Sequence, residues 1–236
     1  MNEKAYRIFS KYISSEKDFR IKLLGDSITQ GCGGSNFLQN GEAFVDGFAR
    51  NPDGFCWANL FKKYMESKYK CEVINNGCAG TRIEFILDNY DILTSPDDDI
   101  TICMIGTNNR NQYFDAGSKR DYEDYLGEFY NNLLKLHNRL EKENKDFIFM
   151  ASVPATPQKE KDTDKLWRIF HMNDVNEAYK KAQKEKNFPF VSLYDLFGDY
   201  VAENKLDMDT LMYDGLHPND DGYRVMYDIL INEFGV

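Results

Sequence analysis

The sequence predicts an α/β fold in which a parallel sheet carries helices on both faces. Short apolar segments alternate along the chain with segments of helical periodicity, and several apolar segments are almost continuously hydrophobic, as in strands buried on both faces. Repeated strand, helix, strand order implies parallel strands in a three-layer α/β/α arrangement. The 236 residues show no internal repeat and no low-complexity linker, so we expect one domain spanning residues 1–236.

Five segments are predicted strands and five are predicted helices. The apolar runs that suit strands are 21–24, 71–74, 100–105, 147–151 and 190–193. The segments with helical spacing are 55–69, 82–89, 121–142, 164–186 and 221–234. Within 121–142, for example, Leu126, Phe129, Leu133 and Leu136 fall three or four residues apart and share one helix face.

Two segments exceed what a minimal unit of this kind needs. In the N-terminal extension, residues 1–20, Tyr6, Phe9 and Ile13 could line one face of an amphipathic helix. We expect that helix to pack on the domain, with packing on another subunit of a homo-oligomer as the alternative. Residues 31–54 form an insertion with six glycines, which either shapes a substrate pocket or is a tolerated surface loop.

Aromatic side chains in and beside this insertion have two interpretations. They could stack on sugar rings or belong to the core. The residues concerned are Phe37, Phe44, Phe48, Phe55 and Trp57.

Charge and cysteine content exclude several classes of function. With 29 basic and 39 acidic residues, the net charge of −10 disfavours nucleic acid and stable membrane association. The N-terminus lacks the apolar stretch of a signal peptide and no later segment is long enough to span a bilayer, which predicts a soluble, cytoplasmic protein. The five cysteines are odd in number and form no C-x-x-C pair, so we expect reduced core thiols and neither disulfides nor a zinc site.

The three histidines have different surroundings. His137 and His171 lie inside helical segments, where we expect them on solvated faces. His217 follows Asp214 by three residues in a segment broken by Gly215 and Pro218. A carboxylate so placed can orient an imidazole and stabilise its protonated form. The alternative is an Asx-type turn that caps the next helix.

Three polar groups are predicted to meet at one edge of the sheet. Ser27 follows the first strand, and ligands of open parallel sheets bind beyond the carboxyl ends of the strands. If the strand order is 2-1-3-4-5, Ser27 faces Asn108, with the glycine-rich segment 75–81 beside them. These are a nucleophile and oxyanion-hole donors, although each alone could be a helix cap or a turn residue.

Taken in order, these blocks resemble the SGNH or GDSL-type serine hydrolase family. They are Gly25-Asp26-Ser27, the segment 75–80, Gly106-Thr107-Asn108-Asn109 and the segment 214–218. The resemblance implies a flavodoxin-like five-stranded parallel sheet of order 2-1-3-4-5. It also implies that Ser27 is the nucleophile, with His217 and Asp214 completing the catalytic triad.

The same resemblance assigns an oxyanion hole and shows one departure. The donors would be the backbone N–H groups of Ser27 and Gly80 and the side chain of Asn108, with Gly77 a less favoured alternative to Gly80. Asn109 stands where the family usually has aspartate, which puts the local loop bonding in doubt.

The function implied is a serine esterase that works through an acyl-enzyme without metal or organic cofactor. The favoured substrates are short acyl groups such as O-acetyl on an oligosaccharide or a small metabolite, with lysophospholipid or thioester cleavage as alternatives. Two rivals are a flavodoxin-like module that cradles the phosphate of a flavin at residues 27–31, and a catalytically inactive relative that binds carbohydrate.

Overall fold

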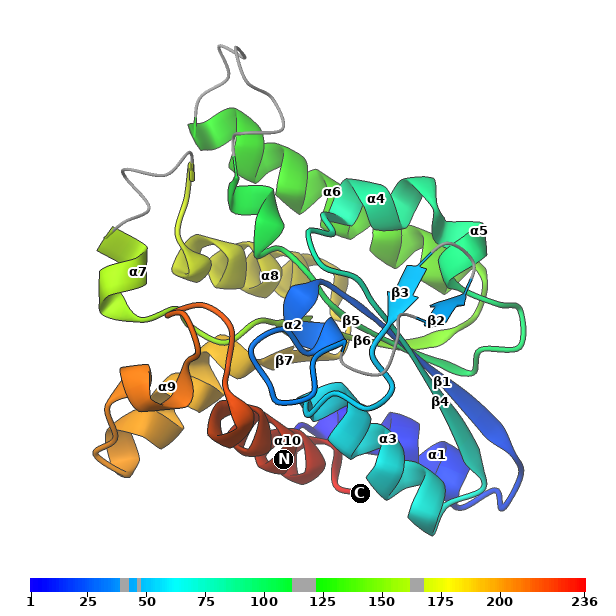
Figure 1. Cartoon of the computed structure of the whole chain (residues 1–236). Coiled ribbons are helices and arrows are strands. Elements are labelled where there is room, and N and C mark those ends of the chain that lie inside the picture. Colours follow the sequence, from blue (N-terminus) through cyan, green and yellow to red (C-terminus); the bar gives the residue numbers. More distant parts are fainter. Residues whose placement is uncertain (39–42, 46–47, 112–121, 162–167) are drawn as a thin grey trace.

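Five parallel strands form the central sheet, in the order β4-β1-β5-β6-β7 (Figure 1). The computed structural model describes residues 1–38, 43–45, 48–111, 122–161 and 168–236. Counted along the chain within this sheet, the strand order is 2-1-3-4-5, which confirms the predicted fold class. The strands are β1 (Phe19–Gly25), β4 (Cys71–Gly77), β5 (Ile100–Met104), β6 (Asp146–Ala151) and β7 (Phe190–Ser192).

Alternate side chains of each inner strand enter two different cores. In β5, Ile102 and Met104 belong to one apolar cluster, whereas Cys103 between them belongs to the other. In β6, Ile148 and Phe149 divide in the same way. Because side chains of a strand point alternately to opposite faces, such near-continuous hydrophobic runs require a cover on both sides.

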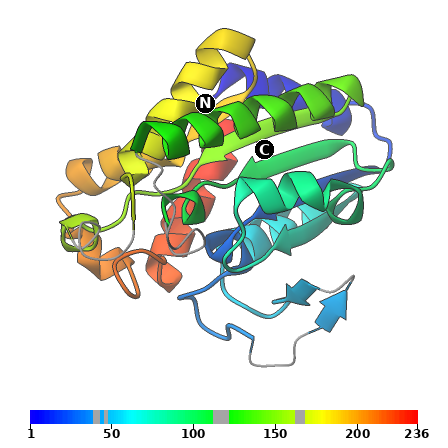
Figure 2. The ribbon, with the colours of Figure 1, turned by 90° about the horizontal axis from the view of Figure 1, so that it is seen from above.

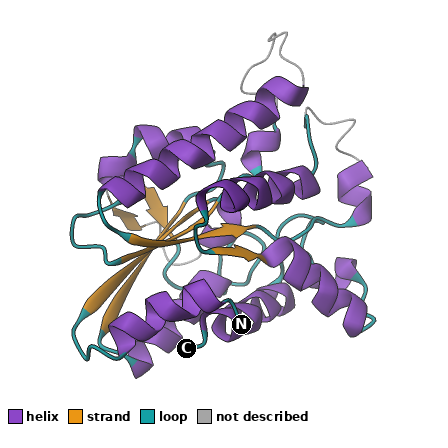
Figure 3. Cartoon of the chain, turned by 180° about the vertical axis from the view of Figure 1, so that it is seen from behind, coloured by secondary structure: helices purple, strands orange, loops and turns teal. Residues whose placement is uncertain are grey.

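Helices supply this cover as two outer layers (Figures 1 and 3). One layer contains α1 (Glu3–Ile13), α3 (Trp57–Lys68), α9 (Leu193–Glu203) and α10 (Asp220–Phe234). The other contains α4 (Ile83–Asp88), α5 (Tyr90–Leu93), α6 (Tyr122–Lys142) and α8 (Met172–Lys186).

The N-terminal extension forms the predicted helix and packs on the protein's own core. Asn2 caps α1 by accepting a hydrogen bond from the Ala5 N–H. The fully buried ring of Phe9 stacks on Phe234 of α10 with centroids 4.9 Å apart. The first and last helices of the chain are therefore joined through an aromatic contact.

The insertion carries an antiparallel strand pair, β2 (Ala43–Val45) with β3 (Phe48–Arg50), that lies apart from the main sheet in Figure 2. Residues 39–42 and 46–47 of the predicted insertion lie outside the described residues. Buried Asn51 anchors its base, because its amide donates to the Gln30 carbonyl (2.8 Å) and its Oδ1 accepts from the Leu38 N–H (2.9 Å).

Some local predictions were wrong. The helix expected over 164–186 begins at Met172, with His171 as its N-cap, and residues 162–167 lie outside the described residues. Leu193 begins α9 instead of ending a strand, because the Ser192 hydroxyl caps that helix. His137 is only 4% exposed and packs against Phe147 and Phe188, so it does not lie on a solvated face.

Two further observations concern membranes and metals. Across the residues that the structure describes, no helix combines the length and apolar character needed to cross a bilayer. The same described residues hold no group of three or more His, Cys, Asp or Glu side chains placed to bind a metal ion.

Candidate active site

Ser27 lies where β1 leaves the sheet and begins the short helix α2 (Ser27–Gln30). The helix forms because Asp26 caps it, its Oδ1 accepting from the Ile28 N–H at 3.0 Å. Asp26 is fully buried and Ser27 is 7% exposed. The carbonyl of Ser27 accepts hydrogen bonds from the N–H groups of Gly31 and Cys32, so the backbone around the serine is fixed.

Asp214 and His217 lie on one tight turn that precedes α10. The Asp214 Oδ1 accepts from the backbone N–H groups of Leu216 (3.0 Å) and His217 (2.8 Å), while its Oδ2 lies 3.0 Å from the His217 Nδ1. The Tyr213 N–H donates to the His217 carbonyl and closes the turn. The Asx-type turn of the alternative interpretation is thus present, and the same carboxylate also holds the imidazole.

The turn and the serine meet although 190 residues separate them. The His217 Nε2 lies 2.9 Å from the Ser27 Oγ, so serine, imidazole and carboxylate form one continuous hydrogen-bonded series. Such a series can move the serine proton to the imidazole while the carboxylate stabilises the imidazolium.

Neighbouring groups shift both pKa values of the histidine–aspartate pair. Burial opposes the charged imidazole, but hydrogen bonds to Asp214 and Cys32 outweigh it and raise the pKa of His217 to about 9. Burial likewise opposes ionisation of Asp214, yet hydrogen bonds from the His217 side chain and backbone hold the pKa of this carboxyl well below its usual range.

Cys32 is a site residue that the sequence did not reveal. Its half-buried thiol is one of the groups that raise the pKa of His217, whereas the cysteine pattern predicts core thiols. Gly33 brings the two segments together, since a Cβ at this position would lie 3.0 Å from the His217 Cβ and 2.5 Å from the Pro218 carbonyl oxygen. The positive φ of Gly33, +95°, also suits glycine. Because Gly33 and His217 lie far apart in the sequence, no sequence pattern predicts that their segments touch.

The loop after β4 is tied to α2. The Ala79 N–H donates to the Gln30 side-chain oxygen (2.9 Å), and the Cys78 N–H donates to the Gly25 carbonyl. Gly80 has a φ of +80°, and among the described residues none other than its two chain neighbours places an atom within 4 Å of where its Cβ would be. Gly77, the less favoured candidate, is instead packed closely against the backbone of Thr29 and Gln30.

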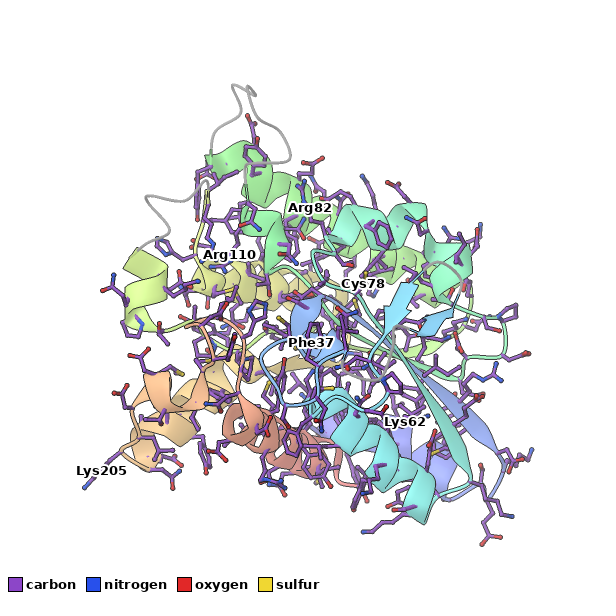
Figure 4. The ribbon with its side chains drawn as sticks, in the orientation of Figure 1. Phe37, Lys62, Cys78, Arg82, Arg110 and Lys205 are labelled. Carbon is purple, nitrogen blue, oxygen red and sulfur yellow. The ribbon has the colours of Figure 1, made fainter. Side chains whose placement is uncertain are left out.

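Asn108 begins a 3-10 turn after β5, η1 (Asn108–Arg110). Its amide nitrogen donates to the Thr81 carbonyl at 3.1 Å, so it contacts the residue next to Gly80. The loops of Ser27, Gly80 and Asn108 therefore adjoin one another at the carboxyl edge of the sheet, where Figure 4 shows Cys78, Arg82 and Arg110.

Asn109, the departure from the family pattern, is well bonded. It is buried, its Oδ1 accepts from the Ile83 N–H (3.1 Å), and its Nδ2 donates to the Glu84 carboxylate (2.9 Å). An aspartate would keep the first bond but place a carboxylate against Glu84. Asparagine suits this position because its amide group can donate a hydrogen bond to Glu84 of α4.

Comparison with known proteins identifies the family. The sequence profile of the GDSL-like lipase/acylhydrolase family matches residues 23–225. The chain belongs to this family. GDSL-like proteins are also found among the solved structures that resemble it, although no curated protein matches the sequence.

An acetylxylan esterase from Geobacillus stearothermophilus is 19% identical, with 92% of this chain and 94% of that chain covered and a TM-score of 0.68. A protein from Parabacteroides merdae described as a GDSL-like lipase is 20% identical over 93% and 96% of the two chains, with a TM-score of 0.67. At these identities, the similarity to both proteins shows that they share the fold of this chain.

Proposed function

We propose that this protein is a serine esterase that cleaves short-chain carboxylic esters, with O-acetyl groups on a carbohydrate or small metabolite as the preferred substrates. The observation that carries the proposal is the series from Ser27 Oγ through His217 to Asp214, with separations of 2.9 and 3.0 Å. Family membership supports the hydrolytic class.

The reaction follows from this geometry. The Ser27 Oγ attacks the ester carbonyl carbon while its proton passes to the His217 Nε2, and Asp214 stays ionised throughout. The imidazolium then protonates the departing alcohol, which leaves an acyl-serine. Water attacks that ester, its proton goes to His217, and the acid leaves as Ser27 recovers the proton.

The negative oxygen of each tetrahedral intermediate needs donors. We assign this role to the backbone N–H groups of Ser27 and Gly80 and to the side-chain amide of Asn108. The space beside Gly80 and the contact of Asn108 with Thr81 support the assignment. Such donors stabilise charge that develops only in the transition state.

A solved relative supports the roles of Asp214 and His217. Two variants of the Geobacillus acetylxylan esterase, described as catalytic mutants, replace with alanine an aspartate and a histidine that stand three residues apart. Asp214 and His217 have the same spacing.

The proposed carbohydrate substrate has support from an exposed ring. Tyr213 directly precedes Asp214 and is 71% exposed, so its aromatic face is free to pack on a sugar. Trp57, in contrast, is fully buried in the core and is not available for sugar stacking. The side chains of Phe44 and Phe48 lie outside the described residues.

The first experiment tests the nucleophile. A fluorophosphonate probe should label the wild-type protein and the Ser35→Ala variant, in which an exposed serine outside the hydrogen-bonded series is changed, but not Ser27→Ala. Hydrolysis of p-nitrophenyl acetate should follow the same pattern. Undiminished hydrolysis by Ser27→Ala would refute the assignment.

The second experiment tests the substrate class. We expect kcat/KM to fall from p-nitrophenyl acetate to the butyrate and octanoate esters, and acetylated xylooligosaccharides to be hydrolysed. Tyr213→Ala should raise KM for the oligosaccharides and leave KM for p-nitrophenyl acetate unchanged. A preference for octanoate, lysophospholipid or thioester substrates would instead favour the other acylhydrolase activities.

A further inference from the structure

Arg110 is a charged side chain in an unusual place, because it is fully buried two residues after Asn108. Its Nε donates to the Thr107 carbonyl (3.1 Å) and therefore closes the turn that holds Asn108. Its Nη1 donates to the Glu160 Oε1 at 3.2 Å. The Arg110 backbone carbonyl also accepts from the Ile169 N–H at 2.7 Å.

Glu160 carries this contact to a second segment. It lies on the short helix α7 (Pro157–Lys161), and its other oxygen lies 2.7 Å from the His171 Nδ1. The Glu160 N–H donates to the Thr156 carbonyl, and the Thr156 N–H donates to the carbonyl of Gly215, which lies between Asp214 and His217. A Cβ on Gly215 would lie 2.8 Å from the Thr156 hydroxyl oxygen, so the packing there is tight.

A continuous set of contacts thus runs from the Asn108 turn to the His217 turn, which we call the Arg110–Glu160 bridge. A buried guanidinium needs charged or hydrogen-bonding partners, because its desolvation is otherwise very costly. Burial and the nearby positive charge of Arg168 lower the pKa of Arg110 to about 10, whereas Glu160 and Asp26 act in the opposite direction. Among the described residues, Glu160 is the carboxylate that forms a direct ion pair with Arg110.

We propose that the Arg110–Glu160 bridge positions the side chain of Asn108 relative to the imidazole of His217 for catalysis. The inference rests on the proposed esterase function and extends it to two residues that touch neither substrate nor reacting atoms. In the proposed reaction His217 accepts the serine proton while Asn108 stabilises the negative oxygen that forms at the same time. A small displacement of either group therefore lowers the reaction rate by a large factor.

Glu160→Gln is the most informative variant, because glutamine keeps the size and one acceptor oxygen but removes the charge. We expect kcat for p-nitrophenyl acetate to fall by about tenfold or more, with KM changed by less than about threefold. Arg110→Lys, which keeps the charge with fewer donors, should also lower kcat, and the double variant should lose less than the product of the two factors.

Asp146→Asn is the matched control. It removes an ion pair with Lys11 (2.6 Å) at the amino end of β6, away from the carboxyl edge that carries the site. Its kcat should equal that of the wild type after correction for the folded fraction, which circular dichroism measures.

Hydrogen–deuterium exchange gives a readout that does not depend on activity. Peptides covering residues 107–111 and 213–217 should exchange faster in Glu160→Gln than in the wild type or in Asp146→Asn. An unchanged kcat or unchanged exchange in folded Glu160→Gln would overturn the inference, as would an equal loss of kcat in Asp146→Asn. A wild-type protein that hydrolyses no ester would refute the proposed function. In that case the difference in hydrogen–deuterium exchange between Glu160→Gln and the wild type would still show whether the Arg110–Glu160 bridge holds the two turns in place.

Discussion

The pH dependence of hydrolysis provides a direct test of the environment of His217. In the proposed mechanism the imidazole must be neutral to accept the Ser27 proton, and its pKa is raised from an ordinary value of 6.5 to about 9. At pH 7, about one enzyme molecule in a hundred then holds the neutral form. We therefore expect kcat/KM to rise about tenfold per pH unit from pH 6 to pH 8 and to level off only above pH 9.

The assay is the initial rate of p-nitrophenyl acetate hydrolysis between pH 5.5 and 10, corrected for spontaneous hydrolysis. Cys32→Ala removes one of the contacts that raise the pKa, so the midpoint of the profile should move to lower pH while the plateau is kept. Cys78→Ala, a half-buried cysteine on the neighbouring loop, is the control and should leave the midpoint in place. A wild-type midpoint near 6.5 would refute the reasoning, because it would mean that burial cancels the effect of Asp214 and Cys32.

Three further outcomes are expected. Asn108→Ala should lower kcat by about 100-fold to 1,000-fold with little change in KM or in the unfolding midpoint, and an unchanged kcat would remove Asn108 from the oxyanion hole. Asn109→Asp should lower the free energy of unfolding by about 1 to 3 kcal/mol at pH 7, because the new carboxylate faces Glu84, and urea titrations should show a smaller deficit at pH 4. Gly33→Ala should reduce both stability and kcat, because its Cβ would lie 2.5 Å from the Pro218 carbonyl oxygen; a variant with wild-type rates would contradict the close packing of this segment on the His217 turn.

The hydrophobic pattern predicts the sheet well because the burial of each strand is visible in its own few residues. The runs at 21–24 and 100–105 are apolar at nearly every position, and short runs of this kind are typical of strands buried on both faces. The positions of Ser27, Gly80 and Asn108 at one edge then follow from parallel strand order, since the carboxyl ends of such strands lie together.

Contacts between distant segments could not be predicted in the same way. The thiol of Cys32 meets His217 because Gly33 permits a close approach, and no periodic pattern marks that event. The ion pair of Arg110 with Glu160 depends on how α7 packs, and α7 is too short to show helical periodicity. Helical periodicity predicts a solvated position for His137, but its ring packs against Phe147 and Phe188, and such a tertiary contact leaves no periodic mark in the sequence.

The aromatic contact between α1 and α10 limits how far the chain can be shortened without loss of folding. The segment shared with the family, residues 23–225, begins inside β1 and ends inside α10, so neither limit coincides with the end of a folded element. A polypeptide cut at those limits would lose Phe9 and Phe234, and would leave Phe61, which contacts both rings, open to water. We expect such a fragment to aggregate through the uncovered face of α3. The stretch that defines the family is thus shorter than the stretch that folds.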